Sequence, residues 1–180
     1  MGPGPSNVSQ RVYDALATPI IGHLDPEFLD IMDETVQMLR EIFGTENRLT
    51  IPVSGTGSSG MEAGFVNVLE KGDKVVIGVN GVFGERMTDV ASRYGAEVIR
   101  IEEEWGRIIE PARIIDVLKK HPDTKLVAIV HAETSTGAKQ PIEEIGSYVK
   151  KTDTLLLVDA VTSLAGCELK IDEWNIDICY

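Results

Sequence analysis

A glycine-rich segment in the first third of the chain has the composition of a phosphate-binding loop. Gly55-Thr56-Gly57-Ser58-Ser59-Gly60 lies between an expected strand and an expected helix. Glycines allow a tight turn and a close ligand approach, and the free N–H groups at a helix start bind anions. The segment also matches the G-x-G-x-x-G pattern of dinucleotide folds, and it is compatible with an ordinary strand–helix turn. Because the next expected strand ends in Asn80, where a dinucleotide fold needs an acid for the ribose, we favour a phosphate site.

A carboxylate stands at the end of the most hydrophobic strand expected in the chain. Asp159 follows Leu155-Leu156-Leu157-Val158. A carboxylate in such surroundings is costly unless it meets a cation or several hydrogen-bond donors. A protonated pyridine nitrogen is one such cation, and a protonated ring is the electron sink of pyridoxal-phosphate chemistry. A Mg²⁺ ligand and an N-cap of the following turn are the alternatives.

Two other strand ends carry side chains suited to a ligand. Phe83 lies in Gly81-Val82-Phe83-Gly84, and its flanking glycines suggest a ring held near a ligand face, with core packing as the alternative. In the polar run from His131 to Gly137, the hydroxyls of Thr134 and Ser135 can bind a phenolic or carboxylate oxygen. His131 itself is typical of a hydrogen-bonded structural residue.

The elements that must position these groups alternate between strand and helix. Strands are expected at residues 49–53, 74–79, 97–101, 125–131, 154–159 and 176–180, and helices at 26–43, 61–69, 85–94, 111–120 and 141–150. This alternation predicts an α/β fold, with a mostly parallel sheet covered by helices on both faces. Ligands of such sheets bind beyond the carboxyl ends of the strands, so we expect the polar strand ends to face one cleft. The first ~20 residues, which contain three prolines, indicate an extended arm.

Composition excludes several classes of partner. The 180 residues are 43% hydrophobic and 26% charged, as in an ordinary globular domain. The net charge of -12 argues against nucleic acids and anionic membranes. No apolar run approaches the ~18 residues of a membrane span. The two cysteines, Cys167 and Cys179, match no metal-site spacing and indicate reduced thiols in a cytoplasmic protein.

Together these motifs resemble the class V branch of fold-type I pyridoxal-phosphate enzymes, and within it the alanine–glyoxylate and serine–pyruvate aminotransferases. The resemblance covers nearly the whole chain and rests on strings in family order, namely Gly2-Pro3-Gly4-Pro5-Ser6-Asn7, Gly22-His23-Leu24-Asp25-Pro26-Glu27-Phe28, Val53-Ser54-Gly55-Thr56-Gly57-Ser58, Asn80-Gly81-Val82-Phe83-Gly84-Glu85-Arg86, His131-Ala132-Glu133-Thr134-Ser135-Thr136-Gly137 and Val158-Asp159-Ala160-Val161-Thr162-Ser163. It implies an N-terminal arm at residues 1–22 and a cofactor-binding large domain from residue 23 to residue 180.

The resemblance also implies a role for each residue of the site. It assigns the phosphate of pyridoxal 5'-phosphate to Thr56, Gly57 and Ser58, the two ring faces to Phe83 and Val161, the phenolic oxygen to Thr134, the ring nitrogen to Asp159 and the bound amino acid to Gly4. The implied reaction moves the amino group of a small amino acid, serine or alanine, to a 2-oxo acid such as glyoxylate or pyruvate. The implied assembly is a homodimer.

The sequence departs from the family pattern at one essential residue. The family's Schiff-base lysine lies a few residues beyond the strand that matches residues 177–180, whereas this sequence ends at Tyr180, and Lys139 and Lys170 fall in other contexts. We therefore expect the chain to stop before that lysine and before the C-terminal small domain, and these 180 residues alone to be inactive. Smaller departures are Phe83, where relatives often have tryptophan, and Ser58, where some have histidine.

Other functions stay open at this point. Another class V activity, such as a cysteine desulfurase or a phosphoserine aminotransferase, is the alternative within the same fold. A Rossmann-type nucleotide-binding domain built on residues 55–60 and a non-catalytic partner-binding domain are the alternatives from other classes.

Overall fold

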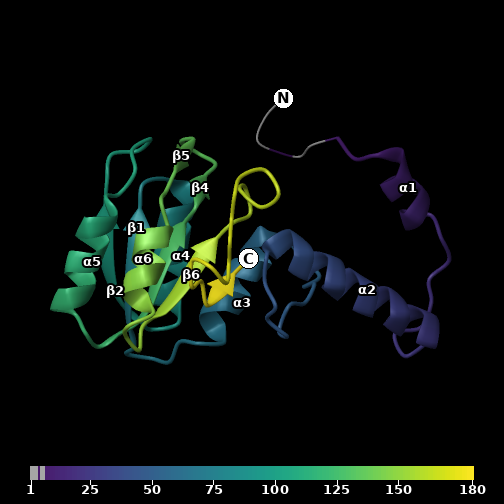
Figure 1. The fold of residues 1–180 in the computed structure, drawn as a ribbon, viewed down its shortest axis with the longest axis horizontal. Helices are drawn as coiled ribbons and strands as arrows, with labels where there is room; N and C mark the ends of the chain where they lie inside the picture. Colours follow the sequence, from purple (N-terminus) through teal and green to yellow (C-terminus); the bar gives the residue numbers. More distant parts are fainter. Residues whose placement is uncertain (1–3, 5–6) are drawn as a thin grey trace.

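Five strands form one parallel sheet at the centre of the computed structural model, which describes residue 4 and residues 7–180 (Figure 1). They are β1 (Lys74–Val79), β2 (Glu97–Glu102), β3 (Thr124–Val130), β6 (Leu155–Asp159) and β7 (Ile178–Cys179). Their order across the sheet is β2-β1-β3-β6-β7, and every neighbouring pair runs parallel. The parallel sheet expected from the alternating pattern is therefore present.

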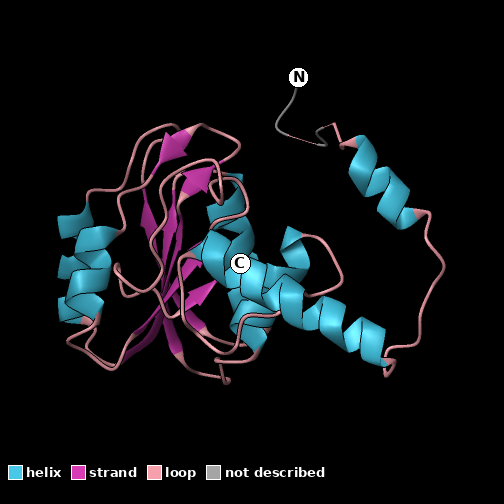
Figure 2. Ribbon diagram, turned by 45° about the vertical axis from the view of Figure 1, so that its right-hand side comes forward, coloured by secondary structure: helices cyan, strands magenta, loops and turns pink. Residues whose placement is uncertain are grey.

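Helices cover both faces of this sheet, as Figure 2 shows. Because side chains alternate along a strand, Val75 and Ile77 pack with Phe65 in one core cluster, whereas Val76 packs with Ile114 in the other. The first cluster includes side chains from α3 (Gly57–Val66) and α4 (Val82–Arg93), and the second includes side chains from α5 (Pro111–Lys120) and α6 (Glu143–Val149). The fold is thus a three-layer α/β arrangement.

A short hairpin extends the polar end of β3. It consists of β4 (Ala132–Glu133) and β5 (Ala138–Lys139), which pair antiparallel. The buried Gln140 side chain ties the end of this hairpin to the loop before α5, since it accepts from Ile109 N at 2.8 Å and donates to Ile109 O at 2.6 Å. The polar turn is therefore held in place at its base.

The helix signals in the sequence locate several boundaries well. The helix α2 occupies Pro26–Phe43 as expected, with the Asp25 side chain accepting from Glu27 N at 3.0 Å and Gly44 as a left-handed C-cap. The helix α5 also has the expected bounds. The helix α4 begins at Val82 rather than at Glu85, and α3 begins at Gly57 rather than at Met61. None of the helices formed by the described residues has the length and apolar character needed to cross a bilayer.

Two expectations for the N-terminal third are wrong. Residues 49–53 form no strand, and the side chains of Leu49, Ile51 and Val53 are exposed. Pro52 supplies no N–H for a sheet ladder, and this stretch has no neighbouring strand to pair with. The arm is not extended throughout either, because α1 (Gln10–Leu16) is a helix of exposed residues far from the sheet (Figure 1). The prolines that suggested an extended arm lie outside that segment. The division at residue 22 stays a prediction.

The close approach of α4 to β1 depends on Gly84. A Cβ at Gly84 would lie 2.7 Å from Gly78 O and 2.9 Å from Val79 Cα, and backbone atoms cannot easily move aside. We expect Gly84→Ala to destabilise the protein by about 1–3 kcal/mol, since overpacking outweighs the gain in helix propensity. The measurement is the urea midpoint of unfolding. Gly22→Ala, where a Cβ would meet nothing within 4 Å, is the control and should shift stability by less than about 0.5 kcal/mol. Equal midpoints for the two variants would contradict this packing.

Candidate functional site

The polar strand ends meet at the carboxyl edge of the sheet, as the topology requires. Val130 at the end of β3 pairs in register with Asp159 at the end of β6, and His131 N donates to Asp159 O at 2.9 Å. The start of α3 reaches the same edge, because a Cβ at Gly57 would lie 2.7 Å from Val161 Cγ2. Residues that are about 100 positions apart in the sequence therefore become neighbours.

Asp159 is a buried carboxylate with hydrogen-bond donors on both oxygens. It is 4% exposed, its Oδ1 accepts from Val161 N at 3.1 Å, and its Oδ2 accepts from the Tyr180 hydroxyl at 3.1 Å. Burial raises the pKa of this carboxyl, the two donors oppose the rise, and the negative charge of Glu133 adds to it. Among the described residues, none of the ion pairs includes Asp159. The site thus offers a negative charge that the described part of the chain does not neutralise.

The sequence offers two alternative roles for Asp159, an N-cap of the following turn and a magnesium ligand. The bond to Val161 N closes the turn after β6, so Asp159 does cap the following backbone. That role uses one lone pair of one oxygen and leaves capacity for a further partner. The described part of the chain holds no group of three or more His, Cys, Asp or Glu side chains suited to a metal ion. The magnesium alternative for Asp159 stays a prediction.

Tyr180 is a site residue that the motifs did not indicate. Its hydroxyl donates to Asp159, and its side chain packs against α3, where a Cβ at Gly60 would lie 2.9 Å from Tyr180 Cβ. Burial and the nearby Asp159 charge raise the pKa of the Tyr180 hydroxyl, so it stays a donor at neutral pH. Only the pairing of β6 with β7 brings these residues together, and a tyrosine 21 positions away carries no local signal for it.

The expected phosphate loop opens α3 and has free capacity for an anion. Thr56 occupies the N-cap position with extended backbone angles, and among the described residues no side chain caps this helix start. Thr56 and Ser58 are exposed, and no described residue accepts a hydrogen bond from the N–H groups of Gly57 and Ser58, the first two of α3. The guanidinium of Arg86, on α4, donates to Ser58 Oγ at 2.9 Å. Arg86 brings a positive charge to this loop, a role that sequence reasoning missed.

Phe83 and Thr134 are linked through Glu133, which precedes Thr134 in the chain and accepts a hydrogen bond from Phe83. Phe83 is half-buried at the start of α4 and packs against the α3–α4 core cluster. Its backbone N–H donates to the carboxylate of Glu133 at 3.1 Å, next to Thr134 in the chain. Thr134 Oγ1 forms a hydrogen bond with Thr162 Oγ1 in the turn after β6. Phe83 therefore packs against the core, and the contact of its ring with a ligand stays a prediction.

His131 has the structural role that a lone histidine suggests. It is 1% exposed, its Nδ1 lies 2.9 Å from Ser163 Oγ, and its ring meets the Trp174 ring edge-on with centroids 6.0 Å apart. Burial, with the charge of Lys139, lowers its pKa and keeps the ring neutral. His131 therefore helps to hold the end of β6 in place, since its backbone N–H donates to Asp159 O.

Gly4 is not brought to this cluster in the structure. It is exposed, and no described atom lies within 4 Å of the position that a Cβ would take. Most of the motif around it lies outside the described residues. The substrate contact expected for Gly4 stays a prediction.

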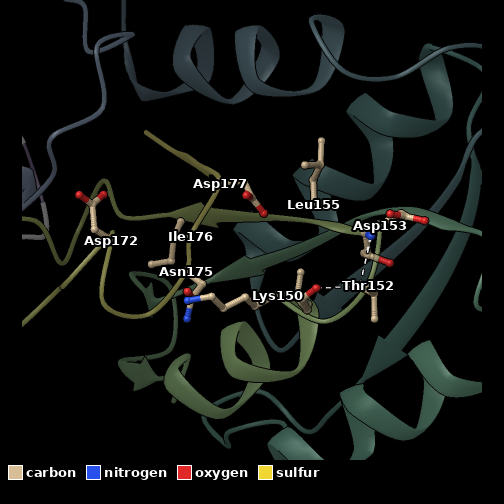
Figure 3. A pocket seen from close by; sticks show the side chains of 10 residues that line it. Lys150, Thr152, Asp153, Leu155, Asp172, Asn175, Ile176 and Asp177 are labelled. Atoms are coloured by element: carbon tan, nitrogen blue, oxygen red, sulfur yellow. Dashed lines mark hydrogen bonds between the residues drawn. The ribbon is translucent and has the colours of Figure 1, made fainter.

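One hollow lined by described residues lies away from the carboxyl edge. It has a volume of about 500 Å³ and is lined in part by Lys150, Asp153, Leu155 and Asp177 (Figure 3). Leu155 is the first residue of β6 and Asp159 is the last, so the hollow lies at the opposite end of that strand. Since ligands of such sheets bind beyond the carboxyl ends, we assign no role to it.

The buried charge of Asp159 predicts a pH-dependent cost in stability. Because its folded-state pKa lies above the ordinary value of 3.8, the folded protein binds more protons between these two values, and stability falls as the pH rises through that window. Asp159→Asn removes the charge and keeps both hydrogen bonds, since the amide accepts from Val161 and donates to Tyr180. Without added ligand, we expect the variant to melt roughly 2 °C higher than the natural protein at pH 7 and no higher near pH 3.5. A variant that melts lower at pH 7 would contradict the cost assigned to this charge.

The chain matches the protein family described as "Aminotransferase class-V" over residues 7–180. It is 47% identical over 177 residues to (S)-ureidoglycine–glyoxylate transaminase of Bacillus subtilis, covering 98% of this chain and 42% of that protein. It is 45% identical to alanine–glyoxylate aminotransferase of Drosophila melanogaster, covering 100% of this chain and 46% of that protein. The chain thus spans less than half the length of these relatives.

Solved structures agree with the sequence relatives. The crystal structure of alanine–glyoxylate aminotransferase from Nostoc sp. superposes with a TM-score of 0.96 at 48% identity, over 99% of this chain and 47% of that one. The crystal structure of ureidoglycine–glyoxylate aminotransferase from Bacillus subtilis superposes with a TM-score of 0.97 at 46% identity, over 99% and 46%. The expected α/β fold of pyridoxal-phosphate aminotransferases is confirmed. The family match and the fold agree on one conclusion, that this chain belongs to the class V aminotransferases.

Proposed function

We propose that the complete protein is a pyridoxal-phosphate-dependent transaminase that moves the amino group of a small amino acid to a 2-oxo acid such as glyoxylate or pyruvate. Class V aminotransferases depend on pyridoxal phosphate. The names of the relatives above share glyoxylate and differ in the second substrate. We take serine or alanine as the amino donor and keep (S)-ureidoglycine as the alternative that the Bacillus relative suggests.

The observation that carries the proposal is the pairing of an anion cradle with a buried carboxylate across one site. The start of α3 offers N–H groups and the hydroxyls of Thr56 and Ser58, which suits a phosphate. Asp159 offers a buried negative charge, which suits a pyridinium nitrogen. Gly57 and Val161 touch, so the cradle is next to the turn that follows Asp159. A ligand with a phosphate at one end and a basic ring nitrogen at the other matches both groups.

We propose that the residues of the site contact different parts of the cofactor. Thr56, Gly57 and Ser58 hold the phosphate, Phe83 and Val161 cover the ring faces, Thr134 donates to the phenolic oxygen, and Asp159 pairs with the ring nitrogen. When bound, pyridoxal phosphate supplies an electron sink for the bond cleavages at the amino acid. Asp159 contributes by keeping a proton on the ring nitrogen, and the Tyr180 and Val161 donors hold its carboxylate in place.

The lysine that would hold the cofactor covalently is proposed to lie beyond Tyr180, together with the small domain, as the family resemblance implies. We further propose a homodimer in the cytoplasm. Apolar side chains exposed on α1 and α2 support an assembly that covers them, and they include Tyr13, Leu16, Leu29 and Met38. The two cysteines are free, which suits a reducing compartment.

The test is amino transfer by the complete protein loaded with pyridoxal phosphate. We expect a visible absorption band that shifts when L-serine or L-alanine is added and returns when glyoxylate is added. Asp159→Asn should lower the transfer rate by roughly 10³-fold, since an ion pair at about 4 Å with an effective dielectric of about 20 contributes ~4 kcal/mol. (S)-ureidoglycine in place of serine or alanine tests the alternative donor. A protein that binds no pyridoxal phosphate would contradict the proposal.

A further inference from the structure

Glu133 is a fully buried acid for which the proposed cofactor contacts leave no role. Its side chain is 1% exposed, at the tip of β4. One carboxylate oxygen, Oε2, accepts from Phe83 N at 3.1 Å and from Gly84 N at 3.4 Å. The other, Oε1, accepts from Ser135 N at 3.2 Å and from Ser135 Oγ at 2.6 Å. The carboxylate is thus fully satisfied, and its donors come from two elements about 50 residues apart.

The same turn also satisfies the remaining N–H group at the start of α4. Ser135 Oγ accepts from Val82 N at 3.0 Å while it donates to Glu133. The first three N–H groups of α4, those of Val82, Phe83 and Gly84, are therefore capped by residues 133–135. A negative charge at a helix N-terminus is also favoured by the helix dipole. This explains why α4 begins at Val82.

Gly81 makes the room that this arrangement needs. A Cβ on Gly81 would overlap the Glu133 side chain. The backbone of Gly81 is extended, so the glycine is required for space and not for an unusual conformation. The Glu133 side chain thus occupies space that only a glycine at position 81 leaves open.

We propose that Glu133 is a positioning residue of the cofactor site, because its carboxylate clamps the first turn of α4 to the turn after β3 and so sets the Phe83 ring relative to Thr134. The role rests on the proposed function, in which Phe83 covers a ring face and Thr134 meets the phenolic oxygen. Phe83 is held through its own N–H, and Thr134 lies between Glu133 and Ser135, which are bonded to each other. Both proposed contacts to the cofactor ring, from Phe83 and from Thr134, therefore depend on the buried Glu133 carboxylate.

The test uses the complete protein titrated with pyridoxal phosphate and compares it with Glu133→Gln. The glutamine keeps the size but offers one acceptor oxygen, and its amide N–H groups face backbone donors. We expect the Kd for pyridoxal phosphate to rise about tenfold, as for loss of hydrogen bonds to a charged group. We also expect a weaker visible circular dichroism per bound cofactor, because that signal reports a fixed ring orientation among its neighbours.

Two variants separate positioning from simple stabilisation. Thr154→Val removes another buried hydrogen bond, from Thr154 Oγ1 to Thr124 O at 2.9 Å, at the opposite end of the sheet. It should lower the melting temperature and leave the Kd and the circular dichroism unchanged. On a Phe83→Leu background, adding Glu133→Gln should change the circular dichroism less than it does in the natural protein, because only the Thr134 contact is then left to displace. Should Glu133→Gln fail to fold, Ser135→Ala carries the same test, with a rise in Kd of roughly threefold.

The outcomes distinguish this role from the proposed function. A natural protein that takes up no pyridoxal phosphate overturns both. A natural protein that binds the cofactor, with a Glu133→Gln variant equal in Kd and in circular dichroism, overturns only the positioning role. The same holds when Thr154→Val weakens binding as much as Glu133→Gln does, or when the effects of Glu133→Gln and Phe83→Leu simply add.

Discussion

Burying the charge of Asp159 is the constraint on which the rest of this site depends. A carboxylate at the end of a strand that is buried on both faces is unfavourable unless a cation or several donors meet it. The fold supplies donors from two directions, the turn at Val161 and the hydroxyl of Tyr180 on the last strand. It supplies no cation from the described residues. The site therefore holds a negative charge in a poorly solvated place, which is what selective binding of a cationic ring requires.

Rigid connections around that carboxylate follow from close packing at glycines. Gly57 brings α3 against Val161, Gly60 makes room for Tyr180, and Gly84 brings α4 against the backbone of β1. Each contact ties a segment proposed to touch the cofactor to the sheet that carries Asp159. The capping of α4 by Glu133 and Ser135 extends this network to the polar turn after β3. These contacts fix the parts of the site relative to one another.

Much of this architecture follows from local signals in the sequence. The apolar runs and the proline and glycine boundaries predict the central strands and the helices at residues 26–43 and 111–120, because their formation depends on patterns within each segment. The strand expected at residues 49–53 is absent because strand formation also needs a partner, which no local pattern reveals. Tyr180 and Glu133 escaped notice for the same reason, since their partners lie 21 and about 50 positions away. The glycines beside Phe83 suggested a ring near a ligand, which stays a prediction; in the structure Gly81 makes room for Glu133, and Gly84 for the close approach of α4 to β1.

The claim that Asp159 keeps a ring nitrogen protonated can be measured directly. The complete protein would be loaded with pyridoxal phosphate labelled with ¹⁵N in the ring, and the chemical shift of that nitrogen would be recorded near pH 7. The account predicts the shift of a protonated pyridinium that stays constant from about pH 6 to pH 8. A shift typical of neutral pyridine in this range would contradict it, because the buried carboxylate would then be facing something other than the ring nitrogen.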